Sequence, residues 1–97
     1  MQGLSKRTSQ DSDNTLCLLI VDDDAYLRAS LRQQFLAEGF VNVVDVGSVT
    51  ELNAALKDAN PDLMLLDIQM PDGNGVEICK RLRSGGFAKP ILILTNK

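Results

Sequence analysis

The chain has 97 residues, enough for one small domain, and 44% of them are apolar while only 4% are aromatic. Its net charge of −3 argues against a nucleic-acid-binding surface, which needs a basic patch. No apolar run approaches the roughly 18 residues of a membrane span, and no apolar block typical of a signal peptide follows Lys6 and Arg7. We therefore expect a cytoplasmic protein with no membrane partner and no direct contact with nucleic acid.

Residues 1–14 are polar and lack periodicity, which predicts a disordered tail. Residues 16–21 form an unbroken apolar run, and the absence of alternation favours a strand buried on both faces. Three carboxylates, Asp22, Asp23 and Asp24, follow this run directly. Like charges repel, so a cluster at the end of a buried strand indicates a cation or a phosphate-handling site.

The rest of the chain alternates between helical and strand patterns. Leu27, Leu31 and Phe35 recur every four residues and predict the buried stripe of a first helix. Ser48 and Glu51 fit a capping box that opens a second helix. The predicted elements are helix 24–38, strand 40–46, a helix from Ser48 to Asn60-Pro61, strand 63–67, loop 71–75, helix 76–83 and strand 91–95.

Strands that alternate with helices predict an α/β fold with a doubly wound parallel sheet. In such sheets ligands bind beyond the carboxyl ends of the strands, where Asp22, Asp23, Asp67 and Thr95 all fall. If the carboxylates are neighbours, a hard divalent cation such as Mg²⁺ would neutralise them. A carboxylate can also accept a phosphoryl group as an acyl phosphate.

Three blocks, in this order and spacing, carry a resemblance to a known family: residues 21–24, residues 65–75 with Asp67, Met70-Pro71 and Gly75, and residues 89–95. Together they resemble the receiver domains of bacterial two-component response regulators, from about residue 15 to the end of the chain. The resemblance implies a flavodoxin-like sheet. Right-handed crossovers give the strand order 2-1-3-4, and the fifth strand and last two helices of the family are absent.

By this resemblance, Asp67 is phosphorylated by a sensor histidine kinase or a phosphotransfer protein. Asp22 and Asp23 form the pocket for Mg²⁺, with Asp23 the direct ligand and Asp22 acting through water. The backbone carbonyl of Gln69 completes the metal site, and Thr95 is the switch hydroxyl that contacts the phosphoryl group.

Other residues receive simpler interpretations. The resemblance also implies that Met70-Pro71 shapes the loop after Asp67 and that Gly75 allows its tight return, and Asp72 is interpreted as a turn residue. Asp24 is a first-turn helix acid, although Asp23 or Asp24 could equally cap the helix. Cys17 and Cys79 are interpreted as buried reduced thiols. Five basic residues are interpreted as parts of solvated helix faces: Arg28, Arg32, Lys80, Arg81 and Arg83.

The chain departs from the family in one respect: the lysine of the fifth strand is missing, and Lys97 does not replace it. An excerpt or a truncated gene is the favoured explanation, and completion by a second copy is another. One side of the third and fourth strands should then be bare, as Leu63/Leu65 with Ile91/Ile93 or the alternating set, and a homodimer could form there. The alternative function is a degenerate receiver that acts only as a protein-docking module. A flavin- or nucleotide-binding protein is disfavoured, because carboxylates after the first strand would repel phosphate and no glycine-rich phosphate loop is present.

Overall fold

The computed structural model describes residues 16–94, so the polar tail predicted over residues 1–14 lies outside the described part of the chain. Four parallel strands form the main sheet, in the order β2-β1-β3-β6. This is the predicted order 2-1-3-4, since β6 is the fourth strand of the sheet in sequence. The bounds are β1 Cys17–Val21, β2 Asn42–Val46, β3 Leu63–Asp67 and β6 Ile91–Leu94.

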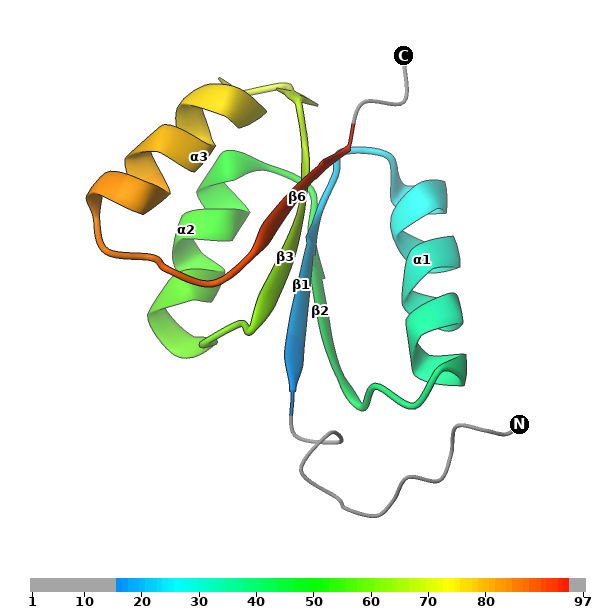
Figure 1. Cartoon of the computed structure of the whole chain (residues 1–97). Helices are drawn as coiled ribbons and strands as arrows, with labels where there is room; N and C mark the ends of the chain where they lie inside the picture. The colour runs from blue at the N-terminus through cyan, green and yellow to red at the C-terminus, as the bar shows by residue number, and fades with distance from the viewer. Residues whose placement is uncertain (1–15, 95–97) are drawn as a thin grey trace.

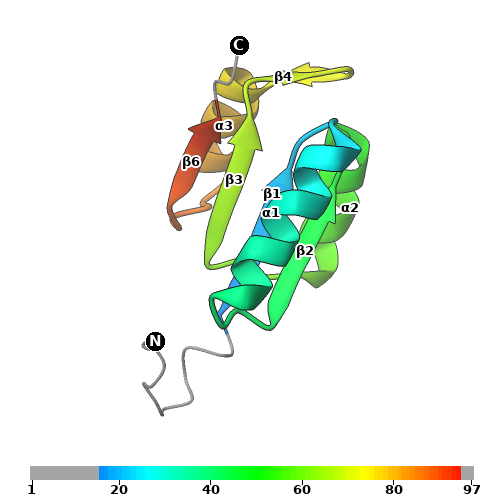
Figure 2. The same ribbon diagram turned by 90° about the vertical axis from the view of Figure 1, so that its right-hand side faces the viewer.

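Helices cover both faces of this sheet. Helix α1 (Ala25–Ala37) lies on one face, and α2 (Val49–Asp58) and α3 (Gly75–Ser84) lie on the other (Figure 1). Beyond the end of β3 the chain forms a small antiparallel hairpin from β4 (Gln69–Met70) and β5 (Gly73–Asn74), with β4 above the main sheet in Figure 2. The sequence predicted only a loop here, because two-residue strands are too short to show a pattern.

The core has two parts, one on each face of the sheet. The larger part lies under α2 and α3 and includes Leu19, Leu52, Met64 and Ile78. The smaller part, Leu18, Ile20, Val43 and Leu65, packs against α1 through Leu31, Phe35 and their neighbours.

No residue of α1 is fully buried, so the predicted buried stripe of Leu27, Leu31 and Phe35 is only half-buried. The reason is that, within residues 16–94, α1 is the only helix on its face of the sheet.

The exposed aliphatic surface is smaller than the sequence predicted. Leu65 is only 4% exposed and Leu63 is half-buried, so β3 is not bare. Exposure is concentrated on β6, where Leu92 is 54% and Ile93 is 36% exposed. Because successive strand residues point to opposite faces, these two side chains belong to the rim of the sheet rather than to one bare face.

Side chains close the first turn of each helix, and at α2 they do so differently from the prediction. Ser48 accepts the Glu51 N–H at 3.0 Å, as a capping box requires, but the Glu51 carboxylate accepts the Gly47 N–H instead of that of Ser48. Gly39 ends α1 with a φ of +107°, a conformation that favours glycine.

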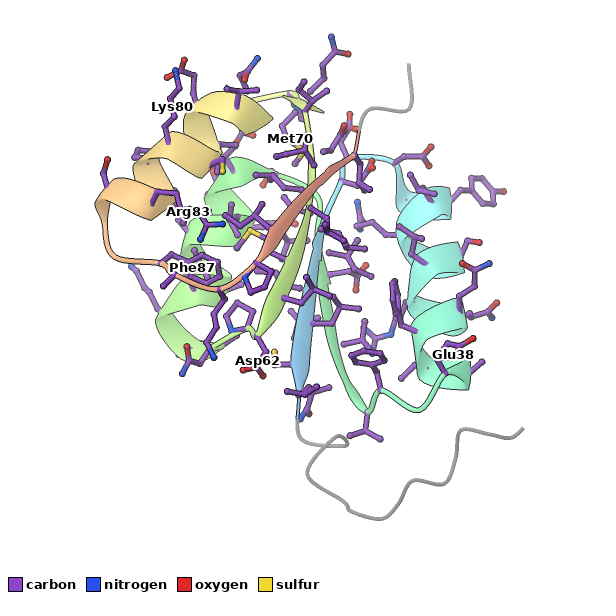
Figure 3. All side chains as sticks on the ribbon, viewed as in Figure 1. Glu38, Asp62, Met70, Lys80, Arg83 and Phe87 are labelled. Carbon is purple, nitrogen blue, oxygen red and sulfur yellow. The ribbon has the colours of Figure 1, made fainter. Side chains whose placement is uncertain are left out.

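The amino end of the sheet is held by Asp62, which accepts the Cys17 N–H at 2.9 Å and lies 3.3 Å from Lys89 Nζ. Figure 3 shows Asp62 and Met70 at opposite ends of β3. Cys17 and Cys79 are free thiols but half-buried rather than buried. Among the described residues, no helix has the length and apolar character needed to cross a bilayer.

Candidate metal centre at the carboxyl end of the sheet

Asp22, Asp23 and Asp67 lie together at the carboxyl end of the sheet. Each offers one carboxylate oxygen, and these three oxygens lie within 4.8 Å of one another. Asp22 follows β1 and Asp67 is the last residue of β3, and these strands are direct neighbours in the sheet. Asp22 and Asp67 are buried, at 2% and 1% exposure, whereas Asp23 is exposed. The convergence predicted from the apolar runs is therefore present.

The hydrogen bonds after β1 distinguish the acids of the cluster from the residue that caps α1. The Asp22 N–H donates to the Val46 carbonyl at 3.1 Å, which extends the pairing of β1 with β2 by one residue. Asp22 Oδ1 accepts the Asp24 N–H at 2.8 Å, and Asp24 Oδ1 accepts the Leu27 N–H at 3.1 Å. Asp24 is thus the N-cap of α1, rather than a residue of its first turn, and the acid cluster does not include it.

The electrostatics of the cluster fit a divalent cation. Asp22 Oδ2 is buried and has no hydrogen-bond partner among the described residues. Burial raises the pKa of Asp22, and the charges of Asp67, Asp23 and Asp24 raise it further, against the lowering effect of the hydrogen bond from Asp24. Mg²⁺ prefers oxygen ligands, and the unpaired buried oxygen of Asp22 beside two other carboxylates offers them. These residues would hold the cation.

The hairpin after Asp67 fixes the position of its carboxylate. Asp67 Oδ1 accepts the Gln69 N–H at 3.3 Å. Met70 is 8% exposed and lies in the larger core, which anchors the hairpin. A Cβ on Gly75 would meet the Asp67 carbonyl oxygen and would lie 2.7 Å from Ile68 Cα, so the chain can return this closely only at a glycine.

The metal-binding and phosphoryl-accepting roles of the site residues remain predictions. The Gln69 backbone carbonyl lies two residues beyond Asp67, at the start of β4, and Thr95 lies outside the described residues.

Arg28 contributes to the site, a role that the sequence does not predict. The sequence predicts solvated helix faces for Arg28 and Arg32, but both donate hydrogen bonds to Asp45 on β2, at 3.0 and 3.2 Å. Arg28 Nη1 also donates to the Asp22 carbonyl at 2.7 Å. The arginines are separated from Asp45 by a helix end and a turn, so no local pattern in the sequence indicates these contacts.

Asp72 and Arg83 also differ from their predicted roles. Asp72 Oδ1 accepts the Val49 N–H at 2.8 Å, so it is a second cap for α2 rather than only a turn residue. Arg83, placed on a solvated face, donates to the carbonyls of Phe87 and Lys89 at 2.9 and 2.7 Å. It therefore holds the connection from α3 to β6.

Comparison with known proteins points in one direction. A family model described as the response regulator receiver domain matches residues 18–97. The DNA-binding response regulator MtrA of Mycobacterium tuberculosis (strain ATCC 25618 / H37Rv) is 40% identical over 80 residues, which are 82% of this chain and 34% of MtrA. This chain thus spans about a third of the length of the curated relatives it matches.

Solved structures give the same result. The response regulator MaeR bound to beryllium trifluoride has a TM-score of 0.80 and 25% identity, covering 86% of this chain and 69% of that one. A chain in the complex of the histidine kinase ThkA with the response regulator TrrA has a TM-score of 0.76 and 28% identity, covering 84% and 70%. By its sequence and its flavodoxin-like sheet, the chain belongs to the family of response regulator receiver domains.

Proposed function

We propose that this receiver domain accepts a phosphoryl group on Asp67 from a sensor histidine kinase or phosphotransfer protein, and that it requires Mg²⁺. The main support is the convergence of three carboxylate oxygens within 4.8 Å, together with the buried Asp22 Oδ2, which has no hydrogen-bond partner among the described residues. A second support is the solved complex of ThkA with TrrA, in which a response regulator is bound by a histidine kinase.

The transfer is a displacement at phosphorus. An oxygen of the Asp67 carboxylate attacks the phosphorus of a phosphohistidine, and an O–P bond forms while the N–P bond breaks. The electron pair of that bond stays on the imidazole nitrogen. The hydrogen bond from Gln69 N–H to Oδ1 restricts rotation of the carboxylate and favours attack by Oδ2.

Asp22 and Asp23 act in this proposal by binding the cation together with Asp67 and the backbone carbonyl of Gln69. Bound Mg²⁺ would offset the charge of the carboxylates and of the incoming phosphoryl oxygens. Thr95 would donate its hydroxyl to the phosphoryl group after transfer. These assignments carry the resemblance over to this chain residue by residue. We also propose a cytoplasmic location, as expected from the sequence.

The test is incubation of the full chain with acetyl phosphate and Mg²⁺, followed by intact mass spectrometry. We expect a mass gain of one phosphoryl group that disappears in Asp67→Asn and in the presence of a chelator. Asp58→Asn is the matched control, because Asp58 is an exposed acid at the end of α2. It should gain mass like the wild type.

Two results would contradict the proposal: no mass gain in the wild type, or a gain that survives Asp67→Asn. If the wild type gains no mass but still binds a histidine kinase, and Asp67→Asn leaves that binding unchanged, the chain is a docking module instead.

A further inference from the structure

The guanidinium of Arg28 is hydrogen-bonded to the backbone of the acid cluster. Its Nη1 donates to the Asp22 carbonyl at 2.7 Å, and its Nε donates to Asp45 Oδ2 at 3.0 Å. The side chain is 21% exposed and that of Asp45 is 26% exposed, so both groups are largely removed from water. One planar group therefore bridges the residue after β1 and the next-to-last residue of β2.

This contact fixes the peptide that joins Asp22 to Asp23. The Asp22 N–H is already held by the Val46 carbonyl at 3.1 Å, as part of the sheet. The carbonyl of the same residue leaves the sheet and is held by Arg28. The orientation of the Asp22–Asp23 peptide determines where both side chains leave the backbone, so Arg28 influences where two of the three acids lie.

Gly47 leaves the space that the guanidinium occupies. A Cβ built on Gly47 would lie 2.7 Å from Arg28 Nη1 and 3.3 Å from Cζ. The φ of Gly47 is not positive, so alanine would suit its backbone and would conflict only with the arginine. The absence of a side chain at this position is therefore explained by the bridge.

We propose that Arg28 is a positioning residue for the cation site and that it sets the affinity for Mg²⁺ by fixing the Asp22–Asp23 peptide. The inference rests on the proposed function, because it assumes that these acids bind the cation. Arg28 is not itself a ligand, since its positive charge would repel the metal. It acts through the backbone, in the way that residues behind the ligands of a metal site orient those ligands.

Arg32 provides a matched control on the same helix. It also donates to Asp45, at 3.2 Å, and to the Val43 carbonyl at 2.8 Å, but the hydrogen bonds it makes do not include the Asp22 carbonyl. Loss of either arginine disturbs the pairing of α1 with β2. Only loss of Arg28 releases the Asp22–Asp23 peptide.

The experiment measures binding of Mg²⁺ to the full chain by isothermal titration calorimetry, with no phosphoryl donor present. Arg28→Lys keeps the charge but loses the fork that reaches both partners, so we expect its affinity for Mg²⁺ to fall by about tenfold. Gly47→Ala should cause a similar loss by displacing the guanidinium. The affinity of Arg32→Lys for Mg²⁺ should stay within about twofold of that of the wild type. This is a smaller change than the loss of a residue that orients the metal ligands produces. The double variant Arg28→Lys/Gly47→Ala should be no weaker than either single variant, because both remove the same support.

The outcomes separate this inference from the proposed function. If the wild type binds no Mg²⁺, the cation site and the inference are both wrong. If the wild type binds Mg²⁺ and both Arg28→Lys and Gly47→Ala bind it equally well, only the inference is wrong. Equal losses in Arg28→Lys and Arg32→Lys would also overturn it. Thermal melts of each variant identify any that are unfolded, and Gly47→Ala keeps the test decisive if Arg28→Lys is one of them.

Discussion

Asp72 accepts the backbone N–H of Val49 at 2.8 Å, which fastens the hairpin after β3 to the first turn of α2. Its Oδ2 also accepts the N–H and the hydroxyl of Thr50, both at 3.2 Å. The first N–H groups of a helix have no partner inside the helix. Ser48 and Asp72 together satisfy this end of α2, so the helix and the hairpin that carries Gln69 are held as one unit.

We expect Asp72→Asn to lower the melting temperature at neutral pH. The backbone N–H of Val49, and then the groups of Thr50, hold the pKa of Asp72 below its ordinary value of 3.8. The ionised carboxylate is therefore favoured in the fold. Its contribution is fully present above the unfolded pKa of about 4 and is lost as the pH falls through the lower folded pKa. The difference in melting temperature between the wild type and the variant should shrink over that range.

Circular dichroism melts from about pH 7 to about pH 2 measure this effect. Asp58→Asn, an exposed acid at the other end of the same helix, is the control and should cause no comparable loss at neutral pH. A difference between the wild type and Asp72→Asn that stays constant with pH would contradict the assignment.

Gly75→Ala should disturb both stability and phosphoryl acceptance. The new methyl group would meet the Asp67 carbonyl and would lie 2.7 Å from Ile68 Cα, and these are backbone atoms that cannot rotate away. We expect a loss of about 1–3 kcal/mol in the free energy of unfolding, the range typical of overpacking. Denaturant titration measures the loss.

Gly85→Ala is its control, because there the nearest atom is the Arg81 carbonyl oxygen at 3.4 Å and φ is −83°. Equal stabilities of the Gly75 and Gly85 variants would show that the close approach at Gly75 is not important for stability.

The sequence predicted the sheet and its acidic edge because both depend on local patterns. Unbroken apolar runs identified β1 and β3, and the acids that end them could be placed at one edge by the rules for parallel sheets. The roles of Arg28 and Asp72 could not be predicted in this way. Each acts on a backbone group of another part of the chain, 6 residues away for Arg28 and 23 residues away for Asp72. Arginine and aspartate are also common on solvated surfaces, so their residue types do not indicate these roles.

The extent to which α1 is buried could not be predicted from the sequence either. The periodicity of α1 indicates which side of the helix faces the sheet. It does not indicate how much of that side neighbouring elements cover. Leu31 and Phe35 are half-buried for this reason, although both pack against the smaller core.

Asp22→Asn should stabilise the protein when no divalent cation is present. Burial and the neighbouring carboxylates raise the pKa of Asp22 above its unfolded value. Its ionised form therefore lowers stability once the pH rises through the folded pKa, and the neutral amide removes that penalty. With Mg²⁺ at about 100 times its dissociation constant, the wild type should gain about 2.7 kcal/mol, and Asp22→Asn should gain less.

Denaturant titrations with a chelator and with Mg²⁺ compare the two conditions. Asp24→Asn is the control, since asparagine caps a helix as well as aspartate does and Asp24 is outside the three-acid cluster. It should keep the gain from Mg²⁺. A wild type with the same stability in both conditions would contradict the prediction.

Leu92→Lys should reduce self-association of the chain. Within residues 16–94, β6 pairs on one side only, with β3, and its exposed aliphatic side chains include Leu92 at 54%. An unpaired edge with apolar side chains invites pairing with another chain, and lysine is the residue that most often prevents it. Sedimentation velocity at several concentrations measures the effect. Val76→Lys adds the same charge at an exposed apolar residue (42%) that lies on α3 and not beside an edge strand, so it should leave association unchanged. Equal effects of the two lysines would place the contact away from β6, and a wild type that is monomeric at every concentration would rule out association through this edge.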